Sequence, residues 1–356
     1  MANGTVALET ILKAYGIGPG DEVIVTPRSF IASAACVNLV GATPVFADVD
    51  LDTEMITPDT VRPLIGPRTK AINVVHLHGR PADMPGFMAL ARQHGLLLFE
   101  DCAQAQGARI DGRPVGSFGH ASAFSFCQDK IMTTGGEGGL VVLAGRAAWQ
   151  RAWSHRDNGK DYERVFQPHH PVGYRWVYNG FGTNARMSEM QAAIGLRQLP
   201  KVAGWVAARA ANARLLALAL ADYPCAVVSP LPAGHEHAYY RFAFRIEPRR
   251  LNPGWNRDRV MTALAAEGIP CFTGPCPEIY LERAYAGGPD AERTGAVPRR
   301  PNAAHLRDVS LTLLVHPTLD ASFLNDCRAA IRKVFGAAMR LSPPPRHRRN
   351  GQALTA

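Results

Sequence analysis

Six short apolar runs decide the fold of this chain: EVIVT at residues 22–26, PVFADV at 44–49, KAINVV at 70–75, LLLFED at 96–101, ASAFSF at 121–126 and GGLVVL at 138–143. Helical patterns alternate with them, beginning with a stretch in which Leu8, Ile11, Leu12 and Tyr15 share one face. This alternation is typical of a mostly parallel sheet with helices on both faces. An α/β protein is therefore expected, with its active groups at the carboxyl ends of the strands.

The second half of the chain has a different pattern. Residues 151–182 form a polar, aromatic-rich segment without clear periodicity, which predicts a long functional loop. Ser188 is the expected N-cap of a helix at 189–199, and a long Ala-rich helix at 202–221 would bridge two domains. Short strand and helix candidates follow, which is the composition of a compact α+β unit.

The length of 356 residues exceeds what one hydrophobic core usually serves. We therefore expect a large domain over residues 1–221, a smaller C-terminal domain over 222–338 and a disordered basic tail over 339–356. The tail carries part of the net charge of +9. No base-reading module accompanies that charge, so we predict no nucleic-acid partner.

The number and spacing of the cysteines and the length of the apolar runs indicate the cellular compartment of the protein. The seven cysteines are odd in number and scattered, so they predict neither a disulfide framework nor a zinc site. No run approaches the roughly 20 apolar residues that span a bilayer. The expectation is a cytoplasmic protein without a membrane partner.

The first candidate site is Asn3-Gly4-Thr5, directly ahead of the first amphipathic helix. Free amides at a helix N-terminus, with a glycine that permits close approach, form an anion site for which phosphate is a natural ligand. The alternative is plain helix capping by Asn3 or Thr5.

Two further candidates lie after predicted strands. Asp101 ends an apolar strand, where a partly buried carboxylate needs a cationic partner; the alternative is a structural Asp that caps the next turn. Ser125 and Lys130 lie in FSFCQDKIMTTGGEGG, residues 124–139. Desolvation at a strand end can lower the pKa of a lysine and make its amine nucleophilic. The alternatives are a solvated loop lysine and an ordinary serine at the edge of the core.

Other cofactor sites fit the sequence poorly. A Walker loop needs its lysine after the glycines, whereas Lys130 precedes them, and GGEGG lacks the spacing of a dinucleotide fingerprint. The histidines at 76, 78, 169 and 170 and the pair Cys271 and Cys276 share no standard ligand spacing. We therefore predict no metal.

Taken jointly, these stretches resemble the DegT/DnrJ/EryC1/StrS family of aminotransferases, which depend on pyridoxal 5′-phosphate (PLP). The resemblance runs in order through NGTVAL, GIGPGDEVIVTPRSF, GATPVFADVDLDT, EDCAQAQGA, FSFCQDK, GGEGG and GTNARMSEMQAAIGLRQL to LLVHPTL, or about nine-tenths of the chain. It implies the type I, aspartate-aminotransferase-like fold, with a mostly parallel sheet in the large domain and a smaller α+β C-terminal domain.

The resemblance also implies roles for single residues. Lys130 would carry PLP as a Schiff base and shuttle a proton, and Asp101 would pair with the protonated pyridine nitrogen. Gln104 would lie near the phenolic oxygen of the cofactor, and Phe30 would stack on the pyridine ring. The phosphate donors would be Gly4, Thr5 and Ser125, with Asn184 reaching the phosphate from the neighbouring subunit of a homodimer that shares its active sites.

The function implied is transfer of an amino group, from glutamate, to a keto sugar attached to a nucleotide, in amino-sugar, polysaccharide or glycoside biosynthesis. Amination of a cyclitol ketone stays open as an alternative. Dehydration of a deoxysugar is disfavoured, because family members with that activity replace the lysine at position 130 by histidine. Family members usually carry a further segment ahead of the Asn3-Gly4-Thr5 motif, and this chain begins almost at it. A catalytically impaired sensor or partner protein is therefore a further alternative.

Overall fold

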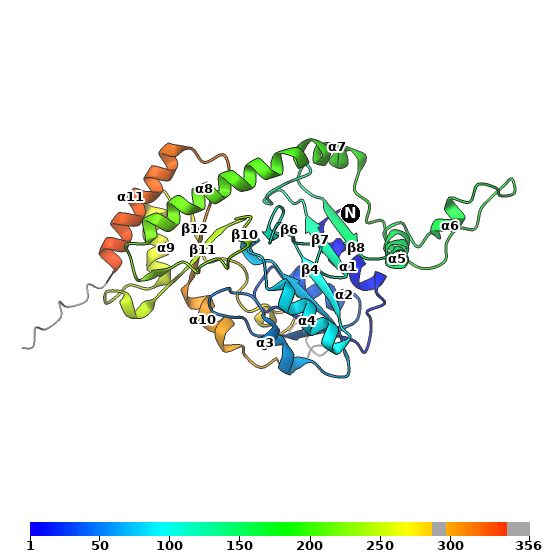
Figure 1. Ribbon diagram of the computed structural model, residues 1–356, viewed down its shortest axis with the longest axis horizontal. Helices are drawn as coiled ribbons and strands as arrows, with labels where there is room; N and C mark the ends of the chain where they lie inside the picture. The colour runs from blue at the N-terminus through cyan, green and yellow to red at the C-terminus, as the bar shows by residue number, and fades with distance from the viewer. Residues whose placement is uncertain (287–296, 340–356) are drawn as a thin grey trace, which may run out of the picture.

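The computed structural model describes residues 1–286 and 297–339. A large unit is built around a central sheet, and the long helix α8 connects it to a smaller unit (Figure 1). The helices are α1 (Gly4–Ala14), α2 (Ala32–Leu39), α3 (Pro58–Val61), α4 (Met84–His94), α5 (Arg146–Arg156), α6 (Tyr162–Val165), α7 (Glu189–Gln198), α8 (Val202–Leu220), α9 (Arg257–Ala266), α10 (Pro301–Val309) and α11 (Ala321–Ala338).

The strands are β1 (Glu22–Val25), β2 (Thr43–Phe46), β3 (Thr69–Val75), β4 (Leu97–Asp101), β5 (Arg109–Ile110), β6 (Arg113–Pro114), β7 (Ala121–Ser125), β8 (Gly139–Leu143), β9 (Ala226–Val227), β10 (His235–Glu236), β11 (Phe242–Ile246), β12 (Cys271–Phe272) and β13 (Ser310–Leu313). The six apolar runs of the sequence thus become the six strands of the central sheet.

The central sheet has the strand order β2-β1-β3-β4-β7-β8. Its first five strands are parallel, and β8 pairs antiparallel with β7. The expectation of an α/β fold with a mostly parallel sheet is confirmed. Because Val75 pairs with Asp101 and Asp101 pairs with Ala123, the carboxyl ends of β3, β4 and β7 lie at one edge of the sheet.

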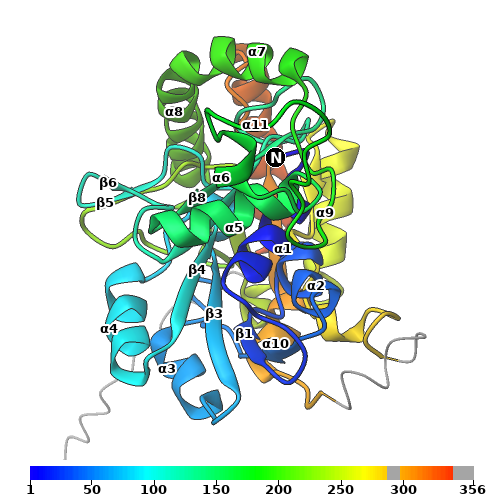
Figure 2. The same cartoon turned by 90° about the vertical axis from the view of Figure 1, so that its right-hand side faces the viewer.

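Helices cover both faces of this sheet, and Figure 2 shows α1 and α2 on one side of β3 and β4 and α3 and α4 on the other. The alternation of side chains along β1 explains this arrangement. Val23 and Val25 join Ile11 of α1 in one hydrophobic core, whereas Ile24 joins Phe87 of α4 in a second core. Burial of each such side chain contributes about 1.5–3 kcal/mol.

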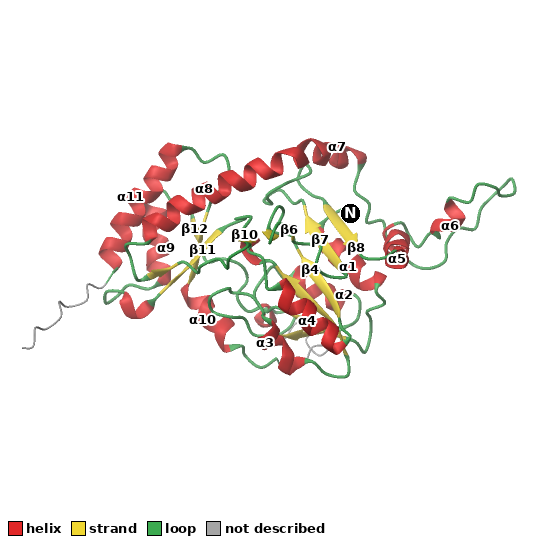
Figure 3. Ribbon diagram, viewed as in Figure 1, coloured by secondary structure: helices red, strands yellow, loops and turns green. Residues whose placement is uncertain are grey.

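The smaller unit has a core of its own. Its sheet has the order β12-β13-β11-β9, and α8, α9 and α11 supply the apolar side chains that pack on it (Figure 3). Helix α10 differs, because Ala303, Leu306 and Val309 lie in a core of the large unit. Strand β13, which follows α10 directly, belongs to the sheet of the smaller unit.

The prediction of one long loop over residues 151–182 is wrong in part. Helix α5 extends to Arg156, and α6 forms a short turn beyond it, on a segment that projects from the body at the right of Figure 1. The rings of Trp149 and Trp153 each lie 5.1 Å from the ring of Tyr162. This contact between two separate stretches orders the segment, and helical periodicity does not reveal it.

The prediction of Ser188 as an N-cap is confirmed, because its hydroxyl accepts the amide hydrogen of Gln191 in a capping box. In the described ranges no helix combines the length and the apolarity needed to cross a bilayer. The predicted basic tail lies outside the described residues, apart from Met339.

Candidate active site

A cavity of about 910 Å³ opens at the carboxyl edge of the central sheet. The smaller unit closes its other side with Tyr240, Arg241, Phe272 and Thr312. Seven of the eight residues predicted for the cofactor site line this cavity: Gly4, Thr5, Phe30, Asp101, Gln104, Ser125 and Lys130. The chain thus brings together residues that are far apart in the sequence.

One end of the cavity is the N-terminus of α1. Asn3 caps this helix, since its Oδ1 accepts the amide hydrogen of Val6 at 3.0 Å. Among the described residues, no acceptor is found for the amides of Gly4 and Thr5. Helix α1 is therefore capped and still offers an anion site at its N-terminus, because Asn3 satisfies only one of the free N–H groups.

The same end includes the carboxyl end of β7. A Cβ atom added to Gly4 would lie 2.7 Å from the Cβ and 3.1 Å from the Oγ of Ser125. Only glycine leaves the helix terminus and the serine hydroxyl this close together. Two backbone amides and one hydroxyl thus converge where an anion can bind.

Asp101 lies at the end of β4 and is buried. Its Oδ2 accepts a hydrogen bond from Ser33 Oγ at 2.7 Å, and its Oδ1 accepts one from the amide of Ala103 at 3.0 Å. Burial raises the pKa of the Asp101 carboxyl, although these hydrogen bonds and the charge of Lys130 oppose the rise. A cation beside the carboxylate would offset its desolvation.

Lys130 reaches the cavity from the turn after β7. Its Nζ lies 3.2 Å from Asp129 Oδ1 and 4.9 Å from the centroid of the Tyr240 ring, and the Tyr240 hydroxyl donates to Asp129. The expectation of a lowered pKa is wrong for the structure described. Burial acts to lower the pKa of Lys130, but Tyr240 and Asp129 together raise it above its ordinary value.

The causes of that rise can be separated. Burial has the opposite effect on the phenol: it raises the pKa of Tyr240, so the Tyr240 hydroxyl is neutral near pH 7. Near pH 7 Asp129 therefore supplies the negative charge that raises the pKa of Lys130.

Phe30 and Gln104 complete the predicted set inside the cavity. The Phe30 side chain is 64% exposed, so the protein leaves one aromatic face open for a ligand to stack on. Gln104 Oε1 accepts the amide hydrogen of His78 at 2.7 Å, which fixes the orientation of its amide group.

The family model described as the DegT/DnrJ/EryC1/StrS aminotransferase family matches residues 1–331. The chain belongs to this family of aminotransferases. Members of the DegT/DnrJ/EryC1/StrS family are PLP-dependent transaminases, and the chain is accordingly an enzyme of this class. The resemblance noted in the sequence is thereby confirmed.

Single relatives agree with this assignment. The chain is 42% identical over 339 residues to the UDP-N-acetyl-3-dehydro-alpha-D-glucosamine 3-aminotransferase of Acidithiobacillus ferrooxidans, covering 94% of this chain and 83% of the relative. It is 37% identical over 351 residues to the L-glutamine:2-deoxy-scyllo-inosose aminotransferase of Streptomyces fradiae, covering 94% and 81%. The solved structure of an aminotransferase from Psychrobacter cryohalolentis superposes with a TM-score of 0.90 at 46% identity, covering 94% of this chain and 86% of that one.

Asn184, the eighth predicted residue, does not line the cavity of this DegT/DnrJ/EryC1/StrS aminotransferase. It is exposed and forms an isolated bridge with Asp157 at the base of the projecting segment. The family resemblance places it in the site of a neighbouring subunit, and that role stays a prediction.

A second group of polar residues at the cavity was not predicted from the sequence as part of the site, and its member His78 lines the cavity itself. Arg28 Nη2 contacts Glu54 Oε2 at 2.6 Å, and Ser310 Oγ donates to Glu54 Oε1 at 3.2 Å. His78 is buried beside them, and neither of its ring nitrogens has a hydrogen-bond partner among the described residues. Burial lowers the pKa of His78 to about 4, against the attraction of Glu54, so the ring is neutral near pH 7.

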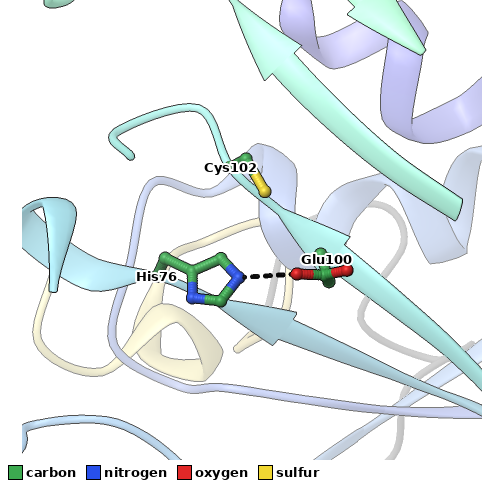
Figure 4. Close-up of side chains that lie close together, drawn as sticks. All are labelled: His76, Glu100 and Cys102. Atoms are coloured by element: carbon green, nitrogen blue, oxygen red, sulfur yellow. Dashed lines mark hydrogen bonds and ion pairs between the residues drawn. The ribbon is translucent and has the colours of Figure 1, made fainter. Parts of the chain in front are cut away.

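Three buried side chains near the site have the residue types of metal ligands: His76, Glu100 and Cys102 (Figure 4). Hydrogen bonds account for the first two. His76 Nδ1 accepts the amide hydrogen of Ala82 at 3.0 Å, so its Nε2 carries the proton and donates to Glu100 at 3.1 Å. Glu100 also accepts three backbone amide hydrogens, each at 2.7 Å, from Gly116, Phe118 and Gly119. The cluster therefore fastens β3 and β4 to the segment before β7.

Proposed function

We propose that PLP binds in the cavity that contains Lys130 and Asp101, and that the enzyme transfers an amino group from glutamate to a keto sugar of a nucleotide-linked sugar. One observation carries this proposal. A lysine amine, a buried carboxylate and the free amides of a helix N-terminus line a single cavity. The amine can bind an aldehyde, the carboxylate can hold a protonated pyridine nitrogen, and the free amides can bind a phosphate.

The residues of the cavity fit the cofactor part by part. The amides of Gly4 and Thr5 and the hydroxyl of Ser125 would hold the phosphate, at the point where a Cβ on Gly4 would fill the space. Asp101 would hold the ring nitrogen, and the open face of Phe30 would stack on the ring. Gln104 would lie beside the phenolic oxygen, and Lys130 would bind the aldehyde carbon covalently.

When bound, PLP supplies an electron sink that acidifies the α carbon of the amino donor. Lys130 Nζ, freed when the amine of the donor takes its place on the aldehyde carbon, would be the base that takes the proton from the α carbon and later returns a proton to the substrate. Asp101 would be ionised beside the ring nitrogen and would keep that nitrogen protonated. Asp129 and Tyr240 orient the Lys130 side chain, because both contact its Nζ and are hydrogen-bonded to each other.

The substrate class rests on the relatives. The relative from Acidithiobacillus ferrooxidans is named for a UDP-linked dehydro sugar, which supports a nucleotide-linked keto sugar for this chain. The relative from Streptomyces fradiae is named for a cyclitol ketone and for glutamine as donor, so a cyclitol acceptor is the second candidate. Dehydration is disfavoured by Lys130, and a non-catalytic sensor with this fold is a further alternative.

We further propose a homodimer with shared active sites. The segment that carries Asn184 also exposes large apolar side chains, among them Phe166, Trp176, Phe181 and Met190. Exposed apolar surface of this kind is typical of an interface, and a second copy would both cover it and bring Asn184 to a phosphate.

The compartment and the domain limits are also proposals. None of the seven cysteines forms a disulfide in the described ranges, which supports a reducing, cytoplasmic location. A second domain is supported by the separate core of α9, β11 and α11, but Ala213, Leu216 and Leu220 of α8 pack in this core too, so the boundary would fall within α8 and not at residue 221. Helix α10 would return to the large domain.

The decisive experiment incubates the protein with PLP, glutamate and a panel of nucleotide-linked 3-keto and 4-keto sugars, with a cyclitol ketone in parallel. Formation of an amino sugar is followed by mass spectrometry, and the Lys130→Ala variant is the control. Amination of a nucleotide sugar that depends on Lys130 is the expected result. Amination of the cyclitol alone supports the second candidate, and a protein that aminates neither with any donor contradicts both.

A further inference from the structure

Arg241 differs from Lys130, the other cationic side chain that lines the cavity. It precedes β11, lines the cavity of Lys130 and is half-buried. Its backbone amide donates to the carbonyl of His78 at 3.3 Å, which ties this point of the smaller unit to the large one. Among the described residues, its guanidinium has neither an ion-pair partner nor a hydrogen-bond acceptor.

Two aromatic rings hold that guanidinium in place. The Cζ atom of Arg241 lies 5.2 Å from the ring centroid of Tyr240 and 5.4 Å from that of Phe272. Stacking of this kind orients an arginine and leaves its five N–H donors available at the edge of the plane. The side chain is thus preorganised for a ligand that accepts hydrogen bonds in a plane.

Two acidic side chains near Arg241 already have other partners. Glu54 pairs with the buried Arg28, and Asp129 pairs with Lys130 and Tyr240. The charge of Arg241 also acts on basic groups, since it disfavours the protonated forms of His78, Arg209 and His316. An anion bound at Arg241 would relieve its repulsion with the neighbouring Arg209.

The position of Arg241 relative to Lys130 limits which anion this is. The same Tyr240 ring contacts the Lys130 Nζ at 4.9 Å and the Arg241 guanidinium. Because each cation lies about 5 Å from the same ring centroid, they are at most about 10 Å apart, a span that a small dicarboxylate amino acid and its hydrogen bonds can bridge. Arg28 and His78 are less suitable, because their unpaired nitrogens are enclosed by the protein.

We propose that Arg241, stacked between Tyr240 and Phe272, binds a carboxylate of the amino donor while the donor reacts beside Lys130. This inference rests on the proposed aminotransferase function and adds a recognition residue to it. The carboxylate and the guanidinium would form paired, charge-assisted hydrogen bonds. A diphosphate of the nucleotide sugar offers related oxyanion chemistry, and the test distinguishes the two sources.

The test measures binding and each half of the reaction separately. Glutarate, a dicarboxylate without an amine, is titrated by calorimetry into the PLP-loaded protein, and UDP is titrated in a parallel arm. The half-reaction with glutamate alone is followed by absorbance. The variants are Arg241→Met and Arg241→Lys, with Arg214→Met as the matched control on the exposed face of α8, beside a different cavity.

We expect Arg241→Met to weaken glutarate binding by about tenfold or more and to raise the glutamate concentration for half-maximal rate similarly. Arg241→Lys should fall between Met and the native residue, and Arg214→Met should behave like the native protein. UDP binding should change little. The proposal is overturned if glutarate and glutamate are unaffected, or if only UDP binding weakens, which would assign Arg241 to the nucleotide.

Failure of the proposed role of Arg241 can be told apart from failure of the proposed function. A native protein that takes up no PLP, or that does not react with any amino donor, contradicts the aminotransferase proposal and not the role of Arg241 within it. Thermal unfolding of both Arg241 variants identifies loss of fold. Should Arg241→Met not fold, Arg241→Lys alone decides, because unchanged glutarate affinity together with an unchanged glutamate response in that variant overturns the inference.

Discussion

Gly4 at the start of α1 lies directly against Ser125 at the end of β7, so that a Cβ on Gly4 would come within 2.7 Å of the Ser125 Cβ. This contact joins the first helix to the sheet at the end of the cavity where the proposed phosphate site lies. Both the packing and the anion site depend on a residue without a side chain.

Gly4→Ala is expected to weaken PLP binding on the order of tenfold and to destabilise the protein by about 1–3 kcal/mol through overpacking. Alanine has the higher helix propensity by about 1 kcal/mol, so a stabilised variant would mean that the contact relaxes freely. PLP titration of the cofactor-free protein and urea unfolding measure the two effects. Gly66→Ala is the control, because its Cβ would meet nothing within 4 Å.

Asp129→Asn should speed the covalent attachment of PLP at pH 7. Asp129 and Tyr240 raise the pKa of Lys130, against the effect of burial, and only the neutral amine attacks an aldehyde. The neutral fraction rises about tenfold per pH unit below the pKa, so the native rate should climb between pH 7 and pH 9. The variant should be severalfold faster at pH 7; slower attachment than in an Asp326→Asn control would contradict this account.

Asp101→Asn should keep the covalent attachment of PLP and lower kcat by about 10²-fold. The amide still accepts from Ser33 and fills the same space, but it cannot hold a proton on the ring nitrogen. Steady-state kinetics and reduction of the attached cofactor with borohydride separate the two properties. A variant with native kcat would remove Asp101 from the proposed mechanism.

His78 should make the protein sensitive to acid. Burial lowers the pKa of His78 from 6.5 to about 4, with Glu54, Arg28 and Arg241 as the charged groups that face it. The unfolded chain binds a proton first, so the free energy of unfolding falls as the pH drops from about 6.5 to about 4, by about 3 kcal/mol. Urea unfolding at pH 7 and pH 4.5 measures this loss.

His78→Phe should reduce that acid-dependent loss, because phenylalanine keeps a planar ring at this position and does not titrate. His94→Gln, on the exposed face of α4, should retain it. Equal pH dependence in the His78→Phe variant and the native protein would show that other groups cause the acid sensitivity.

The central sheet could be predicted because its inner strands β1, β3, β4 and β7 are buried on both faces and therefore form apolar runs, as Val23, Ile24 and Val25 illustrate. Asp101 and Lys130 could be proposed because each follows such a run and parallel strands end at one edge of the sheet. These patterns are local, so they can be recognised in a single sequence.

The supporting contacts could not be predicted, because they join distant stretches. Tyr240 meets Asp129 across 111 positions, and Ser33 meets Asp101 across 68. The pKa of Lys130 was predicted in the wrong direction for this reason, since the partners that raise it belong to the turn and to the smaller unit. The helical turns of the segment after β8 depend likewise on aromatic contacts between Trp153 and Tyr162.

The most direct test of the central claim is to map the attachment point of PLP. The protein is incubated with PLP, reduced with borohydride, digested and analysed by tandem mass spectrometry. The account predicts one pyridoxyl-modified peptide, carrying the modification on Lys130, and its loss in Lys130→Ala. Modification of another lysine with Lys130 left free, or no modification at saturating PLP, would contradict it.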